Sequence, residues 1–277
     1  MINFSAEYFN PVDTLDCGQV FRFRPYKNGY VVFSLDKCAY IFVESGKVYI
    51  DSTDDEYFAD YFDLKRDYSE IVSNALSFDI EKLSFAAEKY RGIRILRQND
   101  FETLVSFLIS QNNNIPRIKN TIEKTCFSLG EKRVFDGTEY YSFPLPERLM
   151  QADEAFYKSA GYGYRGEYVK TVCEQIVKGK LDLASLNLLS TAELKKELLK
   201  IKGVGEKVAD CVSFFGYRRT DSFPVDTWIE KIYHEDFGGE LKDRKKITRY
   251  FVDVFGNNSG YVQQYLFYAK RKGDFND

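Results

Sequence analysis

The sequence predicts an α+β fold, with an N-terminal antiparallel β-sheet lobe over residues 1–95 and an all-helical core over residues 96–277. Two observations support this prediction. Before residue 51, short runs that alternate apolar and polar residues are separated by glycine turns, which is typical of antiparallel strands. From about Asp100, apolar residues recur at helical spacing to the end of the chain. A chain of 277 residues is long enough for two or three such lobes.

The strands and turns of the first lobe follow one another closely. We expect strands at Val20–Arg24, Tyr30–Leu35, Ala39–Glu44 and Lys47–Ile50, with turns at Asn28-Gly29 and Ser45-Gly46. Acidic, aromatic-rich helices are expected between Asp54 and Tyr90.

Helix boundaries in the second half are marked by caps and breaks. Asp100 is expected to cap a helix over Phe101–Ser110, which ends at the polar run 111–114, and Pro116 suits the first turn of the next helix. Further helices are predicted at Tyr168–Lys178, Thr191–Lys200, Thr227–Phe237 and Tyr261–Arg271. Ser190 and Glu193 have the spacing of a capping box. The stretch 130–146 is predicted to be a loop without an assigned function.

Composition excludes several classes of protein. The net charge of −3 argues mildly against DNA binding, although Lys and Arg can still cluster on one face. His234 is the only histidine, which excludes a His-rich zinc site and a Ser–His–Asp triad. No signal peptide or apolar run of membrane-spanning length is present, so we expect no membrane association.

The cysteine pattern indicates reduced thiols. Five cysteines are widely spaced and form no CxxC pair, which is typical of intracellular proteins and makes the cytoplasm the expected location. None lies beyond Cys211, so a C-terminal four-cysteine iron–sulfur cluster is excluded.

A glycine turn, Gly203-Val204-Gly205, separates two helical patterns and predicts a helix–hairpin–helix motif at about residues 191–216. The amides from Val204 to Lys207 are expected to be uncovered at the N-terminus of the second helix. Such amides, together with the helix dipole, bind anions, and a DNA phosphate is a suitable anion. Many non-catalytic DNA-binding modules carry such a turn, so the turn alone does not indicate an enzyme.

Two side chains near the turn are candidate catalytic groups. Lys207 follows the turn, where the positive end of the helix disfavours an ammonium, and a neutral lysine is a nucleophile. Asp226, in the sequence Pro224-Val225-Asp226, delivers a carboxylate at the start of a third helix. Taken singly, Lys207 is compatible with a solvated surface lysine and Asp226 with an ordinary N-cap.

The combination resembles a known family. GVGEK with Lys207, KVADC after it and PVDTW with Asp226 are similar to the helix–hairpin–helix glycosylases of DNA base excision repair, in particular their 8-oxoguanine DNA glycosylase/AP lyase branch. This resemblance implies that Lys207 attacks C1′ of the damaged nucleotide. It also implies that Asp226 supports the cationic sugar-like transition state and orients the nucleophile.

The resemblance also implies a pocket for a flipped base. The carbonyl of Gly18, in CGQVFRF, would accept a hydrogen bond from N7–H of the lesion. Phe267 and Gln263, in GYVQQYLF, would stack on the base and read its Watson–Crick edge, and Cys211 would lie on the other face. The alternatives from the residues alone are a turn glycine, a core helix and a buried packing cysteine.

Further resemblance concerns the DNA around the lesion. In SQNNNIPRIK, Asn112 would fill the gap left by the extruded base, and Arg117 would contact the orphan cytosine. In GYGYRG, Tyr164 would act as a wedge and Arg165 as a second reader of the cytosine. The hairpin glycines Gly203 and Gly205 would approach a phosphate. The alternatives are a polar interhelix cap and a helix-opening turn with packed tyrosines.

Trp228 departs from the family pattern, which often has His at this position, so a phosphate contact there is in doubt. The function implied is a bifunctional glycosylase/lyase that excises 8-oxoguanine from duplex DNA. No metal or organic cofactor is expected, except for a structural cation at the hairpin carbonyls. We expect a monomer in a bacterial or archaeal nucleoid. The alternatives are a helix–hairpin–helix glycosylase for another damaged purine and a non-catalytic DNA-binding module.

Overall fold

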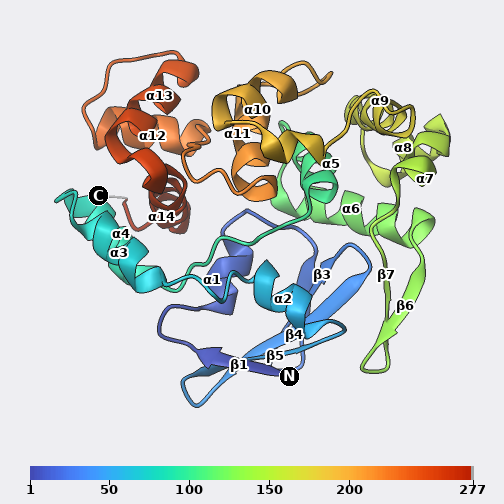
Figure 1. Ribbon diagram of the computed structural model, residues 1–277, viewed down its shortest axis with the longest axis horizontal. Coiled ribbons are helices and arrows are strands. Elements are labelled where there is room, and N and C mark those ends of the chain that lie inside the picture. The colour runs from blue at the N-terminus through green and yellow to red at the C-terminus, as the bar shows by residue number, and fades with distance from the viewer. Residues whose placement is uncertain (276–277) are drawn as a thin grey trace.

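The computed structural model describes residues 1–275 and confirms the α+β prediction. In Figure 1 a β-sheet lobe lies below a larger body of helices, and the N-terminus lies at the sheet edge. Among the described residues, no helix has both the length and the apolar character needed to cross a bilayer.

The sheet has five antiparallel strands in the spatial order β1-β5-β4-β3-β2. The strands are β1 (Ile2–Ser5), β2 (Phe23–Tyr26), β3 (Gly29–Ser34), β4 (Lys37–Glu44) and β5 (Lys47–Ser52). Helices α1 (Pro11–Asp16) and α2 (Asp55–Tyr61) pack on the sheet, and Leu15, Ile41 and Phe58 are buried between them. The alternation of apolar and polar residues in the sequence therefore predicted β3, β4 and β5 correctly.

The first predicted strand is wrong by several residues. Val20, Phe21 and Arg22 are buried and lie before β2, because the Arg22 guanidinium turns inward to pair with Glu102 at 3.1 Å. An arginine in an alternating run does not by itself indicate burial, so this inward turn is not predictable from the local pattern. Strand β1, which pairs with β5, was not predicted.

The first hairpin turn is Lys27-Asn28 and not Asn28-Gly29. Tyr26 pairs with Gly29, so Gly29 already belongs to β3, while Lys27 has a positive φ of 47°. Gly29 is required by close packing, because a Cβ there would lie 2.1 Å from the carbonyl oxygen of Ile41. Ser45-Gly46 forms the second turn as predicted, with φ values of 49° and 74°.

The helical body is built around two central helices, α5 and α14, which are buried along most of their length. Its α-helices are α3 (Tyr68–Leu76), α4 (Glu81–Lys89), α5 (Asp100–Ser110), α6 (Ile115–Leu129), α7 (Pro146–Gln151), α8 (Glu154–Ala160), α9 (Arg165–Val177), α10 (Thr191–Leu198), α11 (Glu206–Cys211), α12 (Thr227–Glu235), α13 (Arg244–Phe255) and α14 (Ser259–Lys272). Short 3-10 turns cover Ser185–Leu188 and Gly256–Asn258, and a π-helical turn covers Val212–Gly216. Helix α14 packs on α4, α12 and α13 (Figure 1).

Two capping predictions have different outcomes. The capping box of Ser190 and Glu193 is present at the start of α10. Helix α5, in contrast, is capped by Asn99, whose side chain accepts from the amide of Glu102 at 3.0 Å. Asp100 is the first residue of the helix and not its cap, because the preceding Asn offers the same chemistry one position earlier.

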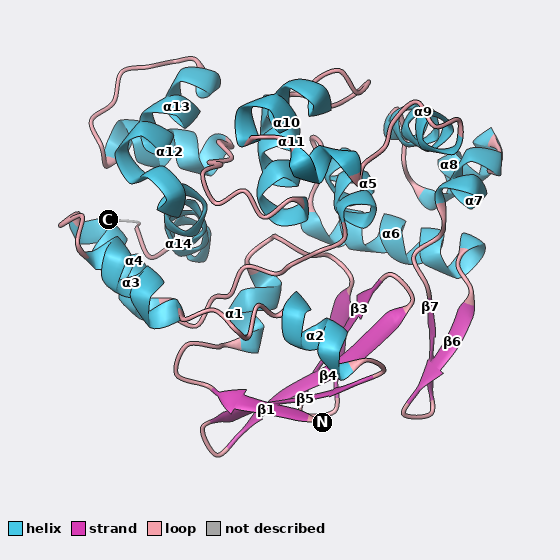
Figure 2. Ribbon diagram, in the orientation of Figure 1, coloured by secondary structure: helices cyan, strands magenta, loops and turns pink. Residues whose placement is uncertain are grey.

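The stretch 130–146 is not a simple loop, as it was predicted to be. It forms a hairpin of β6 (Lys132–Phe135) and β7 (Thr138–Tyr141) around Asp136-Gly137, with φ values of 48° and 71°. Figure 2 shows this hairpin running down beside the sheet lobe. The Tyr26 hydroxyl donates to the Asp136 carboxylate at 3.0 Å, and the Tyr140 ring stacks on Phe33 at 5.3 Å. The hairpin thus fixes the sheet lobe to the helical body.

Candidate active site

The hairpin between α10 and α11 has the predicted glycine geometry. Gly203 has a φ of 89°, and a Cβ at this position would lie 2.4 Å from the ring of Tyr168. Gly205 is the N-cap of α11 and faces open space. The amide of Val204 donates to the carbonyl of Ile201, so the expectation that it is uncovered is wrong. Only the amides from Gly205 to Lys207 are left for an anion, since no acceptor among the described residues takes them.

Lys207 occupies the first turn of α11 and is half-buried. Its ammonium lies 5.3 Å from the centroid of the Phe107 ring, on α5. Among the described residues, no carboxylate oxygen lies within 4.0 Å of it. The residue is therefore neither a fully solvated lysine nor part of a salt bridge, and its nitrogen is available to a ligand.

Asp226 is the N-cap of α12, and one of its carboxylate oxygens accepts both capping hydrogen bonds. Oδ1 accepts from the amides of Trp228 and Ile229, at 3.0 Å each. Oδ2 has no hydrogen-bond partner in the described part of the chain. The capping alternative and the catalytic interpretation are compatible, because capping fixes the carboxylate while leaving one oxygen available.

An inner pocket brings together six residues that the sequence assigned to catalysis or lesion binding. These are Gly18, Lys207, Cys211, Asp226, Gln263 and Phe267. The pocket has a volume of about 40 Å³, which is space for little more than water. A purine therefore enters only after the walls move apart.

Helix α14 positions two walls of the inner pocket through consecutive glutamines. The Gln263 amide donates to the carbonyl of Pro224 at 3.3 Å, next to Asp226. The Gln264 amide donates to the carbonyl of Cys17 at 2.6 Å, next to Gly18. Gln264 was not singled out from the sequence, although its pairing with Gln263 in an apolar helix was a usable signal. Gln263 Oε1 is buried without a partner among the described residues, so it is an acceptor that a bound base can satisfy.

An outer cleft of about 700 Å³ opens on the same two residues, Lys207 and Asp226. Asn112, Tyr164, Gly205, Lys207 and Asp226 line it, so the pair lies where the inner pocket meets the cleft. Asn112 is exposed with a φ of 45°, a conformation that Asn tolerates well. Tyr164 is 53% exposed. The cleft is therefore much larger than the inner pocket.

Arg165 is buried, which the sequence did not predict. Its guanidinium donates to the carbonyls of Gln111 and Asn112, with Nη2 to the Asn112 oxygen at 2.8 Å. The same group lies 4.6 Å from the Tyr164 ring centroid. Arg165 thus holds the turn that carries Asn112 and supports Tyr164.

Arg117 and Trp228 lie at the surface. Arg117 is exposed in the first turn of α6, and its guanidinium makes no ion pair or hydrogen bond within the described residues, although its amide donates to the Asn114 side chain at 3.0 Å. Trp228 is 38% exposed, and the Lys231 ammonium lies 5.6 Å from its ring. Neither residue lines the inner pocket or the outer cleft.

A buried ion pair beneath the hairpin was missed from the sequence. Lys195 of α10 lies 2.7 Å from Asp210 and 3.1 Å from Glu206, both on α11. Burial raises the pKa of Asp210 to about 6, and the Lys195 ammonium opposes this rise. The pair fixes α11, and therefore Lys207, relative to α10.

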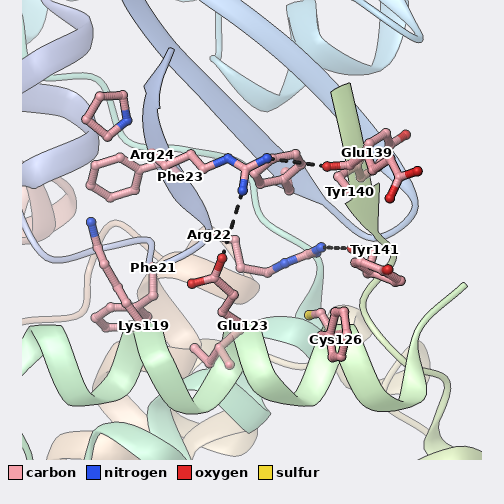
Figure 3. Close-up of a pocket in the computed structure, with 14 residues that line it drawn as sticks. Phe21, Arg22, Phe23, Arg24, Lys119, Glu123, Cys126, Glu139, Tyr140 and Tyr141 are labelled. Carbon is pink, nitrogen blue, oxygen red and sulfur yellow. Dashed lines mark hydrogen bonds and ion pairs between the residues drawn. The ribbon is translucent and has the colours of Figure 1, made fainter. Parts of the chain in front are cut away.

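A second recess, of about 480 Å³, lies between the sheet, α6 and the β6–β7 hairpin. In Figure 3 the Arg24 side chain crosses it between Glu123 and Glu139, and Lys119 points toward Phe23. Lys119 Nζ lies 3.3 Å from the Phe23 ring centroid. None of the predicted site residues lines this recess, so it is distinct from the site that contains Lys207 and Asp226.

Comparison with known proteins identifies the family of the chain. Residues 1–104 match the family described as "8-oxoguanine DNA glycosylase, N-terminal domain". Residues 105–256 match the "HhH-GPD superfamily base excision DNA repair protein" family. The chain belongs to the HhH-GPD superfamily of base excision DNA repair proteins.

Three individual proteins show how similar the chain is to known glycosylases. The crystal structure of Clostridium acetobutylicum 8-oxoguanine glycosylase/lyase with DNA containing cytosine opposite 8-oxoG has a TM-score of 0.91 and 37% identity, over 97% of this chain and 94% of that one. A probable N-glycosylase/DNA lyase of Methanothermobacter thermautotrophicus is 29% identical over 76% of this chain and 73% of its own length. An N-glycosylase/DNA lyase of Saccharomyces cerevisiae is 35% identical over 56% of this chain, which matches 44% of the yeast protein.

The five cysteines are expected to resist thiol reagents in the native state. All are buried, and burial raises the pKa of Cys126 and Cys211 to about 11 and that of the other three to about 12. At pH 8, a thiol with a pKa near 11 is ionised in only about one molecule in a thousand, and the thiolate is the reactive form.

Titration with 5,5′-dithiobis(2-nitrobenzoate) measures this. We expect negligible fast labelling in buffer and five thiols in guanidinium chloride. Fast labelling of one thiol in buffer would contradict the burial described above.

Proposed function

We propose that the protein is a bifunctional DNA glycosylase/AP lyase that excises 8-oxoguanine from duplex DNA. The observation that carries this proposal is the position of Lys207 and Asp226 between the inner pocket and the outer cleft. A base swung out of a duplex in the cleft would enter the pocket, and its sugar would stop beside the amine and the carboxylate.

The chemistry follows from these two groups. The Lys207 nitrogen, in its neutral form, attacks C1′ and the bond from C1′ to N9 of the base breaks. The free Oδ2 of Asp226 stabilises the positive charge that develops on the sugar. The amine loses a proton, the sugar ring opens, and a Schiff base links Nζ to C1′. Loss of a C2′ proton then expels the 3′ phosphate and cuts the strand.

Lesion and strand recognition are assigned to the residues around the pair. Gly18, Cys211, Gln263 and Phe267 would enclose the base. In the cleft, Asn112 would fill the gap in the duplex and Tyr164 would enter the base step. Arg117, which is exposed and without an ion pair in the described structure, is the better candidate for contact with an orphan cytosine, because Arg165 is bound to the carbonyls beside Asn112.

Excision assays test the proposal directly. Duplexes containing 8-oxoguanine opposite each of the four bases are incubated with the protein, and the released base and the cut strand are measured separately. We expect release of 8-oxoguanine followed by slower strand cleavage, with cytosine the preferred partner. Excision of an alkylated purine but not of 8-oxoguanine would favour another glycosylase specificity. Binding without release of any base would favour a non-catalytic DNA-binding module.

Chelation is expected to leave the reaction unchanged. The proposed steps use only an amine and a carboxylate of the chain, so no metal participates in bond breaking. Excision and cleavage rates in excess EDTA should stay within about twofold of the untreated rates. A loss of activity restored by a divalent cation would contradict this prediction, and a loss of thermal stability alone would indicate a structural cation at the hairpin.

A further inference from the structure

Arg271, near the end of α14, carries a buried hydrogen-bond donor without a partner among residues 1–275. Its Nη2 donates to the carbonyl of Asp16, and the same nitrogen lies 3.0 Å from the Asp16 carboxylate. Nη1 is buried and has no hydrogen-bond partner among the described residues. A buried unpaired guanidinium N–H is costly, and in a native structure it requires an explanation.

The unpaired nitrogen lies next to Gly18 and Phe267, two residues that line the inner pocket. A Cβ built on Gly18 would lie 3.4 Å from Arg271 Nη1 and 3.4 Å from Phe267 Cε1. Both atoms therefore lie against Gly18, and the guanidinium carbon of Arg271 lies 5.9 Å from the Phe267 ring centroid. A ligand stacked on Phe267 and in contact with Gly18 would meet this nitrogen.

The order of side chains along α14 indicates which end of the base would meet Arg271 Nη1. Gln263, Phe267 and Arg271 are four residues apart, so each is displaced from the last by about 6 Å along the axis. In the proposed function, Gln263 reads the Watson–Crick edge and Phe267 supports the ring. The imidazole end of the purine then points toward Arg271, and in 8-oxoguanine this end carries the C8 oxygen.

We propose, on the basis of the function proposed above, that Arg271 is a specificity-determining residue whose Nη1 donates a hydrogen bond to the C8 oxygen of the lesion. Guanine has only a hydrogen at C8, so this donor would stay unpaired against the undamaged base. A ligand that leaves a buried polar group of its site unpaired is strongly disfavoured relative to one that pairs with that group. Arg271 would therefore add a second discriminating contact to the one at the Gly18 carbonyl.

Replacement of Arg271 by Met, which keeps much of the apolar stem, tests the proposal. Single-turnover rates are measured on two duplexes, one with 8-oxoguanine and one with a preformed abasic site, which has no base to recognise. Lys272→Met is the matched control, because Lys272 also pairs with Asp16, at 3.1 Å, but is more exposed. Thermal melting checks the fold of both variants.

We expect R271M to lose roughly 10- to 100-fold in 8-oxoguanine excision, as for a lost charged hydrogen bond. Its borohydride trapping on the abasic site should stay within about twofold of wild type, and K272M should resemble wild type on both duplexes. Wild-type excision by R271M would overturn the proposal, and so would an equal loss on both duplexes, which would indicate a structural role. Wild-type protein that acts on neither duplex would instead refute the proposed function.

Discussion

Replacing Lys207 with Gln is expected to abolish strand cleavage and to lower 8-oxoguanine release by at least about 10³-fold. Gln has a similar length but no nucleophilic amine, so the C1′–N9 bond would have to break without attack from the protein. The structure gives the Lys207 nitrogen no alternative role in an ion pair within the described residues, so little stability should be lost. Rates are measured under single-turnover conditions, where product release does not contribute.

The matched control for this variant is Lys202→Gln. Lys202 lies in the same hairpin and is exposed, and its ammonium is 2.5 Å from Glu167. Both substitutions remove one positive charge from the hairpin, so both should weaken DNA binding similarly. Only K207Q should lose 8-oxoguanine release and strand cleavage. If both variants kept wild-type excision rates, the assignment of the nucleophile would be wrong.

Replacing Asp226 with Asn is expected to lower base excision by about 10²- to 10³-fold while leaving the fold intact. Asn caps helices about as well as Asp, so α12 keeps its cap and the free energy of unfolding should change little. The loss then reports the missing negative charge beside the sugar. Single-turnover excision and thermal melting are measured on the same preparation.

Two further variants separate charge from capping. Asp226→Ala removes both the charge and the helix cap. It should lower the free energy of unfolding by about 1 kcal/mol, in addition to slowing base excision. Asp243 caps α13 and accepts from the amide of Lys245 at 2.9 Å, so Asp243→Ala is a matched cap deletion away from the pocket. It should cost similar stability without loss of excision. An unimpaired D226N variant would show that the carboxylate has no catalytic role.

The predictions that held depend on local sequence. The capping box at Ser190 and the unusual backbone angles of Gly203 each follow from a few neighbouring residues, and both are present, as is the N-cap at Asp226 that was the alternative to its catalytic interpretation. The gathering of Gly18 with Gln263 in one pocket was inferred from family resemblance, because residues so far apart in the chain have no local pattern that joins them.

The burial of two arginines was not predicted, because it depends on interactions between distant segments. Arg22 is buried because Glu102 and the carbonyls of Leu35 and Tyr141 take its donors. Arg165 is buried because the turn at Gln111 presents carbonyls to it. In both cases a charged residue lies inside the protein only because its partners come from another element, which periodicity does not reveal.

The closed inner pocket is also a property that sequence does not show. Its volume of about 40 Å³ depends on how the loop of Gly18 and the helix of Phe267 pack, through Gln264 and Arg271. Base binding in this account therefore requires a movement of these walls. The identities of the lining residues were predictable from family motifs, whereas their separation was not.

Borohydride trapping followed by peptide mapping tests the central claim most directly. The protein is incubated with a duplex containing 8-oxoguanine, the Schiff base is reduced, and the adduct is digested and located by mass spectrometry. The account predicts one covalent adduct, on Lys207, that is lost in K207Q. An adduct on another residue, or none with wild-type protein that has released the base, would contradict it.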